Sequence, residues 1–426
     1  MKKEIFKVLI SDFIEKELPA IYNRDISIPL NSNKIISVIG ARRVGKTYFL
    51  FSLIKKLREK KGNDKIVYLN FEDDRLFPLT LSDMNSFVEA YYELYPQNKK
   101  KTVYFFFDEI QIVEKWEMFI RRIYDSEKCK IFLTGSSSKL LSKEIATSLR
   151  GRTITYEIFP YSFKEYLSLK GVSYDYYSSS NKAKIVNLYK EYFQWSAYPE
   201  LLTQNEIEKQ KIVNEYLNLI IYKDIVERYK VTNLFLVKYL INFFLSNTAN
   251  LMSITKIYHD IKSQGIKISK DSIFQYLEYL EDAFILFSVK ISSENIREVQ
   301  RNPRKIYCID NALTDAVSIE NNLGRKFENL VFLELRRRGL YISYFKNTNE
   351  VDFVFKENRK TRLINASYSI ANKTTRDREV KSLLEGMDYF NVTESYLLTD
   401  NYEEKIIIGK KTINVLPFWK WTLMEN

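Results

Sequence analysis

The segment GARRVGKT, from Gly40 to Thr47, constrains the fold of this chain more than any other stretch. Two glycines are separated by four residues, and a lysine and a threonine follow the second glycine. The apolar run KIISVI precedes the segment. From Thr47 onward the sequence reads TYFLFSLIKKLREKKG, which has the apolar spacing of a helix. A strand, a glycine loop of this kind and a helix, in that order, are typical of a loop that binds phosphate groups.

The chemistry of phosphate binding explains these residue types. The loop turns backbone N–H groups toward phosphate oxygens, and the following helix adds its positive N-terminal end. Lys46 would reach the β- and γ-phosphates, and Thr47 would offer its hydroxyl to Mg²⁺. The predicted nucleotide-binding residues are Gly40, Ala41, Arg42, Arg43, Val44, Gly45, Lys46, Thr47, Tyr48 and Ser136.

The two arginines inside the loop are less expected. Because the loop backbone wraps the phosphates, we expect the side chains of Arg42 and Arg43 to point away from the nucleotide. They would then face DNA, an acidic partner or an acid of the same domain. A direct contact with phosphate is the alternative.

Two acids follow the apolar run Val103 to Phe107, which reads as a buried parallel strand. Functional groups of open parallel sheets lie at the carboxyl ends of the strands. We therefore predict that Asp108 belongs to the Mg²⁺ shell and that Glu109 polarises the attacking water. Two adjacent acids with separate roles favour hydrolysis over nucleotide storage.

Further strands end in polar residues. CKIFLTGSSSKLL places Thr134, Ser136 and Ser137 after its apolar run, where a hydroxyl could sense the γ-phosphate or cap the next helix. The alternation of strands and helices from Ile35 to Ile158 predicts an α/β fold, a P-loop NTPase with a doubly wound parallel sheet. The chain lacks the Asn-Lys-x-Asp strand end of guanine-binding domains, so ATP is the expected nucleotide.

Composition excludes several other chemistries. The chain has 426 residues but one histidine and two cysteines, which argues against zinc fingers and disulfide frameworks. No apolar run reaches the ~18 residues of a membrane helix, and the N-terminus lacks a signal-peptide core, so we expect a cytoplasmic protein that does not enter a membrane. The net charge of +12 favours polyanionic partners, although a lysine-rich surface alone would explain it.

Several segments together resemble the archaeal and bacterial AAA+-type ATPases that carry a C-terminal DUF4143 domain. They are GARRVGKT, YLNFEDD, FFFDEIQ, FLTGSSSKLL, LRGRTITYEIFPYSFKEYL and FKNTNEVDFVF. The resemblance covers most of the chain, although SAYPE, residues 196–200, departs from the family's glycine-rich turn.

The resemblance implies roles for individual residues. The glycines, Lys46 and Thr47 match Walker A, Asp108 and Glu109 match Walker B, and Ser136 matches sensor 1. Arg150 and Arg152 match an arginine-rich turn from which related ATPases supply a catalytic arginine to a neighbouring subunit, which implies a homo-oligomer. A surface pair that solvates a turn is the alternative.

The segment from Leu251 to Ile291 reads as helix, turn, helix and strand, and the residues after it read as a hairpin wing. This pattern predicts a winged-helix domain, with a protein-interaction or lid module as the alternative. Acids at the end of the second helix would repel phosphates. The predicted DNA contacts are Lys267, Lys270, Ser272 and Gln275 on the helices, and Arg297, Arg301, Arg304 and Lys305 on the wing.

The C-terminal part has the pattern of a restriction-endonuclease-like fold. A helix with Glu328 and a strand ending near Asp352 are followed by a second strand, which reads Asn365-Ala366-Ser367 where a PD-(D/E)xK nuclease needs acid-x-Lys. We therefore expect no nuclease activity. A lysine that reaches back from another element, Lys346 or Lys373, is the alternative.

These patterns predict a P-loop ATPase core in residues 1–160, a helical lid or linker in 161–232, a winged helix in 233–306 and a degenerate nuclease-like α/β domain in 307–426. The expected function is Mg²⁺-dependent ATP hydrolysis coupled to conformational change on DNA or a protein partner. The alternatives are a slow nucleotide switch in signalling or defence, and a DNA-binding protein with a degenerate nuclease domain.

Overall fold

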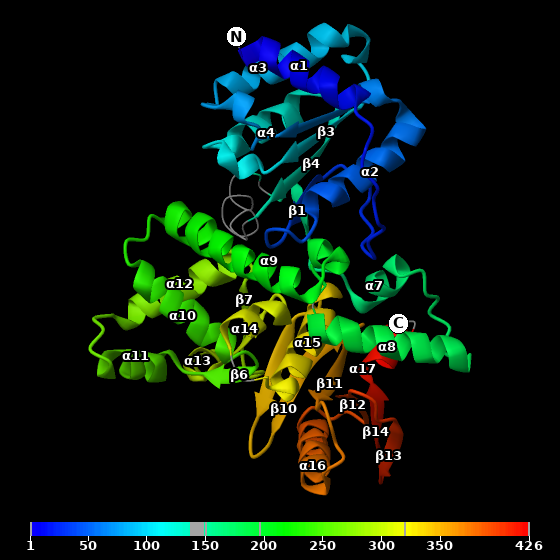
Figure 1. The fold of residues 1–426 in the computed structure, drawn as a ribbon, viewed down its shortest axis with the longest axis vertical. Coiled ribbons are helices and arrows are strands. Elements are labelled where there is room, and N and C mark those ends of the chain that lie inside the picture. Colours follow the sequence, from blue (N-terminus) through cyan, green and yellow to red (C-terminus); the bar gives the residue numbers. More distant parts are fainter. Residues whose placement is uncertain (1, 137–148, 150, 196, 319–320, 425–426) are drawn as a thin grey trace. The chain divides into compact units, whose positions relative to one another are not determined.

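The computed structural model describes residues 2–136, 149, 151–195, 197–318 and 321–424. The chain forms two compact units, Met1–Phe159 and Pro160–Asn426 (Figure 1). Within the described residues, no helix combines the length and the apolar character needed to cross a membrane.

The first unit is built on a five-stranded sheet in the order β2-β3-β4-β1-β5, and its neighbouring strands all pair in parallel. The strands are β1 (Ile35–Ile39), β2 (Ile66–Asn70), β3 (Val103–Asp108), β4 (Cys129–Gly135) and β5 (Thr153–Glu157). Every residue of β1 and β3 is buried, as expected for central strands of a parallel sheet that is covered on both faces. The predicted parallel α/β sheet is therefore confirmed.

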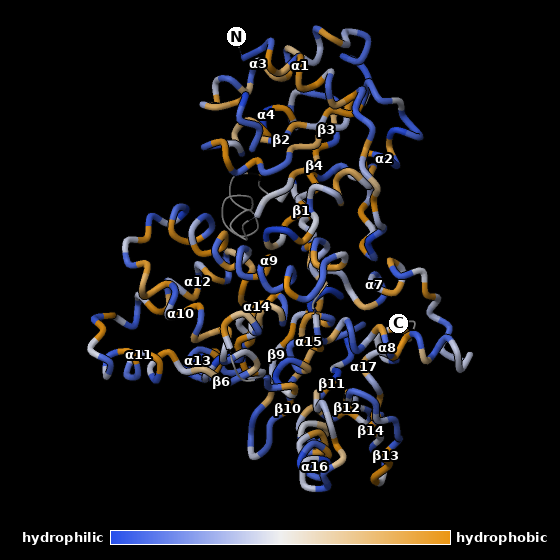
Figure 2. Tube along the Cα trace, in the orientation of Figure 1, coloured by the Kyte–Doolittle hydropathy of each residue, from blue (hydrophilic) through white to orange (hydrophobic). Residues whose placement is uncertain are grey.

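One helix precedes the first strand, and others connect the strands. They are α1 (Lys2–Glu15), α2 (Lys46–Lys61), α3 (Asp83–Leu94) and α4 (Trp116–Ser126), with one-turn helices at Asn63–Lys65, Asp74–Leu76, Pro96–Asn98 and Ile110–Ile112. Strands β3 and β4 at the centre of the unit carry apolar colours in Figure 2. Their rings stack across the sheet, with 4.5 Å between the centroids of Phe106 and Phe132. This apolar core holds the carboxyl ends of β1, β3 and β4 in fixed positions.

The second unit starts with helices. They are α7 (Phe163–Leu169), α8 (Ser179–Trp195), a 3-10 helix (Pro199–Thr203), α9 (Glu206–Leu219), a π-helical segment (Ile220–Glu227) and α10 (Leu234–Ser246). Capping boxes begin two of them: Ser162 and Glu165 exchange hydrogen bonds at α7, and Asn205 and Glu208 do so at α9.

A small antiparallel sheet in the order β6-β8-β7 follows α10. Its elements along the chain are β6 (Asn250–Met252), α11 (Ile254–Ser263), α12 (Lys270–Asp282), β7 (Leu286–Val289), α13 (Ile296–Arg301) and β8 (Arg304–Cys308). Two details of the predicted wing are wrong. The connection contains the helix α13, and Lys305 on β8 is only 2% exposed and pairs with partly buried carboxylates.

The rest of the second unit is a six-stranded mixed sheet in the order β13-β14-β12-β11-β10-β9. Its elements are α14 (Asn311–Val317), α15 (Leu323–Arg337), β9 (Ile342–Lys346), β10 (Glu350–Glu357), β11 (Lys360–Ala366), α16 (Lys373–Tyr389), β12 (Glu394–Thr399), β13 (Glu404–Ile408), β14 (Lys411–Pro417) and α17 (Phe418–Leu423). The strand predicted to end near Asp352 instead forms two strands, and Asp352 lies near the start of the second, β10. The reason is a short turn after Lys346 that reverses the chain and pairs β9 with β10.

Candidate functional site

The loop between β1 and α2 forms a tight turn over the end of the sheet. Gly45, just before α2, has φ 94°, and Gly40 has φ 151°. A Cβ atom on Gly40 would lie 2.2 Å from the carbonyl oxygen of Ile158. Since backbone atoms cannot approach a Cβ so closely, position 40 requires glycine, and position 45 favours it for its left-handed conformation.

Lys46 is the first residue of α2, and its side chain is buried along the loop. Its Nζ donates to the carbonyl oxygens of Gly40, at 3.2 Å, and Ala41, at 3.0 Å. It also lies 3.6 Å from Oε1 of Glu109. The ammonium therefore lies inside the curve of the loop, beside the acid that follows β3.

Asp108, the last residue of β3, accepts three hydroxyl hydrogen bonds. Thr47 and Tyr68 donate to Oδ2 at 2.7 Å each, and Thr134 donates to Oδ1. Burial raises the pKa of Asp108 above its ordinary value, although the three hydroxyl donors act in the opposite direction. The Thr47 hydroxyl and a carboxylate are oxygen ligands of the type that Mg²⁺ takes in nucleotide sites, so this pair fits the predicted metal position.

Glu109 lies one residue further, in the left-handed region at φ 54°. Its backbone N–H donates to Oγ1 of Thr134 at 3.0 Å, and its carboxylate accepts from the Gln111 amide. Burial by itself would raise the pKa of Glu109, but the Lys46 ammonium and the Gln111 amide more than offset it and lower the pKa. The carboxylate is therefore held ionised, oriented and next to a cation.

Strand β4 lies between β1 and β3, and its end brings hydroxyl groups to the acids. Thr134 contacts both acids, and Ser136 accepts from the Gln111 amide at 3.4 Å. The structure thus brings together Lys46, Thr47, Asp108, Glu109 and Ser136 of the predicted site. The predicted Ser137 lies outside the described residues.

The loop arginines differ in their surroundings. Arg42 Nη1 lies 3.6 Å from Oε1 of Glu72, at the turn after β2, whereas Arg43 is exposed with φ 65°. Tyr48 is 54% exposed on α2. A third arginine, Arg24, was not predicted: its guanidinium donates to the carbonyl oxygens of Val44, at 3.3 Å, and Phe159.

Of the two arginines of the predicted finger, only Arg152 lies in the described residues. Its Nη2 lies 3.1 Å from Oδ1 of Asp125 on α4, and its guanidinium lies over the ring of Tyr124 at 5.4 Å. Arg150 lies outside the described residues.

Two residues around the acids were not predicted, Tyr68 and Gln111, and Thr134 was predicted only as a hydroxyl that could sense the γ-phosphate or cap a helix. Tyr68 faces the Asp108 position because β2 pairs with β3, and Thr134 does so because β4 pairs with β3. In the sequence, the signals were the place of Thr134 at the end of an apolar run and the spacing of Gln111, two residues after Glu109.

The predicted DNA contacts in the second unit are exposed at Lys267, Lys270, Gln275, Arg297 and Arg301. Ser272 is partly buried. Arg304 is also partly buried, and its guanidinium lies over the Phe274 ring at 5.9 Å.

The predicted relics Glu328 and Asp352 do lie together, with Lys305 between them. Asn365 is fully buried, and its amide donates to Glu379 at 2.7 Å. The lysine between the acids is Lys305, and it is neither Lys346 nor Lys373, which the sequence analysis considered.

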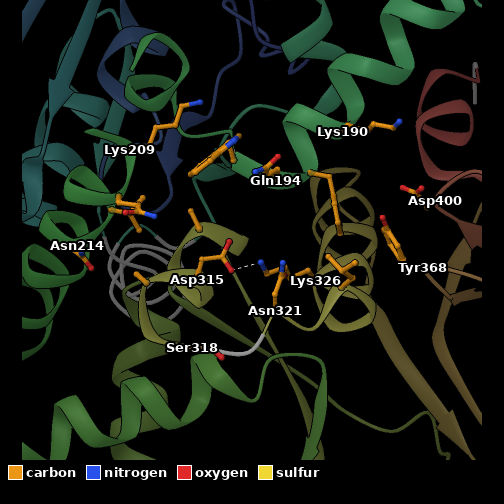
Figure 3. A pocket seen from close by; sticks show the side chains of 17 residues that line it. Lys190, Gln194, Lys209, Asn214, Asp315, Ser318, Asn321, Lys326, Tyr368 and Asp400 are labelled. Atoms are coloured by element: carbon orange, nitrogen blue, oxygen red, sulfur yellow. Dashed lines mark ion pairs between the residues drawn. The ribbon is translucent and has the colours of Figure 1, made fainter. Parts of the chain in front are cut away.

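The second unit also contains a pocket of about 740 Å³. Figure 3 shows Asp315 and Lys326 forming an ion pair at its centre, with Lys190, Lys209 and Tyr368 around it. None of the described residues that line this pocket is a predicted site residue.

Family models match two parts of the chain. An AAA domain matches residues 32–167, which include the loop, both acids and β4. Residues 186–324 match a domain of unknown function, DUF8612. The AAA part of the resemblance is therefore confirmed, whereas the DUF4143 part is not.

Relatives match almost the whole chain. The uncharacterized protein MJ1544 of Methanocaldococcus jannaschii is 41% identical over 99% of this chain and 96% of its own length. An uncharacterized protein of Haemophilus influenzae is 30% identical over 88% of this chain and 89% of its own length. Among solved structures, the Aeropyrum pernix ORC1 protein in complex with DNA covers 74% of this chain and 91% of its own, at 12% identity and a TM-score of 0.33. The chain belongs to the family that includes MJ1544, and it carries an AAA-type P-loop domain.

Proposed function

We propose that this protein is a Mg²⁺-dependent ATPase whose nucleotide state changes its conformation and thereby acts on DNA or a protein partner. The observation that carries the proposal is the cluster at the carboxyl edge of the parallel sheet. There an ammonium, a hydroxyl–carboxylate pair and a second, oriented carboxylate lie next to a glycine loop. Phosphoryl transfer needs this set, because its catalysis consists mainly of positioning and charge stabilisation.

Each residue has a distinct role in the proposal. Lys46 would exchange its contacts with the loop carbonyls for oxygens of the β- and γ-phosphates. Thr47 and Asp108 would hold Mg²⁺, which neutralises phosphate charge when it is bound. Glu109, which is kept ionised and aimed by Gln111, would accept a hydrogen bond from the attacking water and take its proton. Ser136 would report the presence of the γ-phosphate through the Gln111 amide.

Arginines would extend this site. Arg42 would stay with Glu72 and stiffen the turn beside the loop. Arg150 or Arg152 would act on the nucleotide of a neighbouring subunit, and Arg152 would have to leave Asp125 to do so. This part of the proposal requires a homo-oligomer, in which specific activity rises with protein concentration.

In the proposal, the second unit is the part that contacts the partner. The order α10, β6, α11, α12, β7 and β8, with an antiparallel three-stranded sheet, is the order of a winged helix. We propose a helical lid in 161–232, this winged helix in 233–306 and a nuclease-like domain without nuclease activity in 307–426. Exposed lysines and arginines on α11, α12 and α13 favour DNA as the partner, since such side chains neutralise phosphates.

The test measures steady-state phosphate release over a range of protein concentrations, with and without duplex, branched and single-stranded DNA. Hydrolysis that DNA stimulates supports the proposal. ATP binding without turnover under all conditions would favour the slow nucleotide switch, and a protein that fails to bind ATP would refute both.

The DNA part has its own test, the double variant Lys267→Ala and Lys270→Ala. We expect weaker DNA binding, and a plot of log affinity against log salt that is shallower by roughly 0.9 for each phosphate that the variant no longer neutralises. The matched control is Lys405→Ala with Lys410→Ala, two exposed lysines of the same unit near the β13–β14 turn. Equal DNA affinity and equal salt dependence of both double variants would rule out contact through the start of α12 and the turn before it.

A further inference from the structure

An ion cluster around one buried lysine joins the two sheets of the second unit. Lys305 lies on β8 of the three-stranded sheet, and its side chain is 3% exposed. Its Nζ lies 2.9 Å from Oε1 of Glu328 on α15, 2.8 Å from Oδ1 of Asp352 and 2.6 Å from Oε1 of Glu350, the last two on β10. One ammonium therefore contacts three carboxylates from two elements of the six-stranded part of the unit.

Neutral donors orient two of these carboxylates, Glu328 and Asp352. The Tyr307 hydroxyl donates to Oε1 of Glu328 at 2.7 Å, and the backbone N–H of Ala366 donates to Oδ2 of Asp352 at 2.9 Å. The Tyr307 ring in turn stacks on Phe332 of α15, with 4.2 Å between the ring centroids. The carboxylates are thus fixed by the packing of β8 against α15 and by the pairing of β10 with β11.

The three carboxylates need a positive charge between them. Acids this close repel one another, and partial burial reduces the water that would screen them. Burial by itself would lower the pKa of Lys305, but Asp352 and Glu328 raise it well above its ordinary value. The ammonium therefore stays charged, and burial together with Asp352 raises the pKa of Glu328 to about 7.

The arrangement differs from a two-acid metal site in one respect. In such a site a divalent ion lies between the carboxylates, and a lysine lies beside the attacking water. Here the lysine nitrogen itself lies between them. In the described part of the chain, no group of three carboxylate, imidazole or thiol side chains is arranged to hold a metal ion.

We propose that the Lys305 ammonium is the resident cation of this cluster, in the place that a divalent metal ion holds in two-acid sites. It offsets part of the negative charge of Glu328, Glu350 and Asp352, and it links the three-stranded sheet to α15 and β10 without a metal. The same contact keeps metal ions out, so these acids carry out no metal-dependent chemistry while Lys305 is in place. Figure 1 shows β7, α15 and β10, the labelled elements around this junction.

The test removes the ammonium and counts bound metal. Lys305→Met keeps an unbranched side chain of similar length and removes the ammonium, with its charge and its hydrogen-bond donors. Mn²⁺ bound to the full-length, nucleotide-free protein is measured from the paramagnetic resonance of the unbound ion. We expect the variant to bind one more Mn²⁺ per chain than the wild type, and the added change Asp352→Asn to abolish that gain.

A matched control is available in the chain. Lys346 lies 3.3 Å from the same acid, Glu350, but its side chain is 48% exposed. Lys346→Met makes the same chemical change on the surface, and we expect it to leave Mn²⁺ binding as in the wild type. Equal Mn²⁺ binding by Lys305→Met and the wild type would overturn the proposal.

A second comparison decides the matter if Lys305→Met does not fold. Asp352→Asn with Lys305 intact should bind as many Mn²⁺ ions as the wild type, because the ammonium already fills the cluster. A loss of one Mn²⁺ in this variant would mean that a metal ion occupies the cluster in the wild type, and the proposal would be wrong. Unchanged binding supports it.

Discussion

Replacing Glu109 with glutamine separates nucleotide binding from hydrolysis. The amide has the shape of the carboxylate and can still accept from Gln111 through its oxygen, so the loop and β3 keep their geometry. It cannot take a proton from water. A positioned general base contributes roughly 10²–10⁴ in rate, so we expect Glu109→Gln to raise the hydrolysis barrier by about 3–5 kcal/mol.

The same geometry predicts the effect on binding. The Glu109 carboxylate lies 3.6 Å from the Lys46 ammonium, where a unit charge pair attracts by about 4–5 kcal/mol at an effective dielectric constant near 20. Phosphates compete with that attraction for the ammonium. Since the glutamine carries no charge, we expect the variant to bind ATP as tightly as the wild type or more tightly.

Two measurements test this prediction: equilibrium binding of a fluorescent ATP analogue, and phosphate release under single-turnover conditions with saturating enzyme. Glu114→Gln makes the same isosteric change at an exposed acid five residues further along and should leave both quantities unchanged. Hydrolysis by Glu109→Gln at the wild-type rate would refute the reasoning, because another group would then activate the water. Loss of ATP binding would show that the carboxylate supports the loop instead.

Two further predictions concern groups next to Glu109. Lys46→Ala should abolish ATP binding, because it removes the buried cation that faces the phosphates, and unchanged affinity for labelled ATP would contradict the phosphate-loop interpretation. Gln111→Ala should lower kcat about tenfold and leave KM nearly unchanged, because the acid remains but loses the amide that aims it. A change in KM alone, measured by steady-state kinetics over a range of ATP concentrations, would place Gln111 in nucleotide binding.

The parallel sheet and the phosphate loop could be predicted because their signals are local. The run of apolar residues in β3 and the glycines at positions 40 and 45 impose a strand and a tight turn whatever surrounds them. The same spacing placed Lys46, Asp108 and Glu109 at one edge, since parallel strands end on the same side of a sheet.

In the wing and the nuclease-like region, local sequence patterns did not predict every detail of the structure correctly. The helix, turn, helix and strand before it made a hairpin the expected form of the segment after β7, but the segment contains the helix α13, which Asn295 caps. Lys305 looked like a surface cation in a basic stretch. Its burial depends on acids that lie 23, 45 and 47 residues further along the chain, and no local pattern encodes that distance.

The sequence by itself determined the phosphate loop and the two acids that follow β3, because backbone geometry and residue spacing act within a few residues. Only the tertiary structure decided which side chains surround them. Thr47 meets Asp108 across 61 residues of chain, and Thr134 reaches it across 26, because β4 lies between β1 and β3. Strand order depends on how whole elements pack, and so do the partners of Asp108, Glu109 and Lys305.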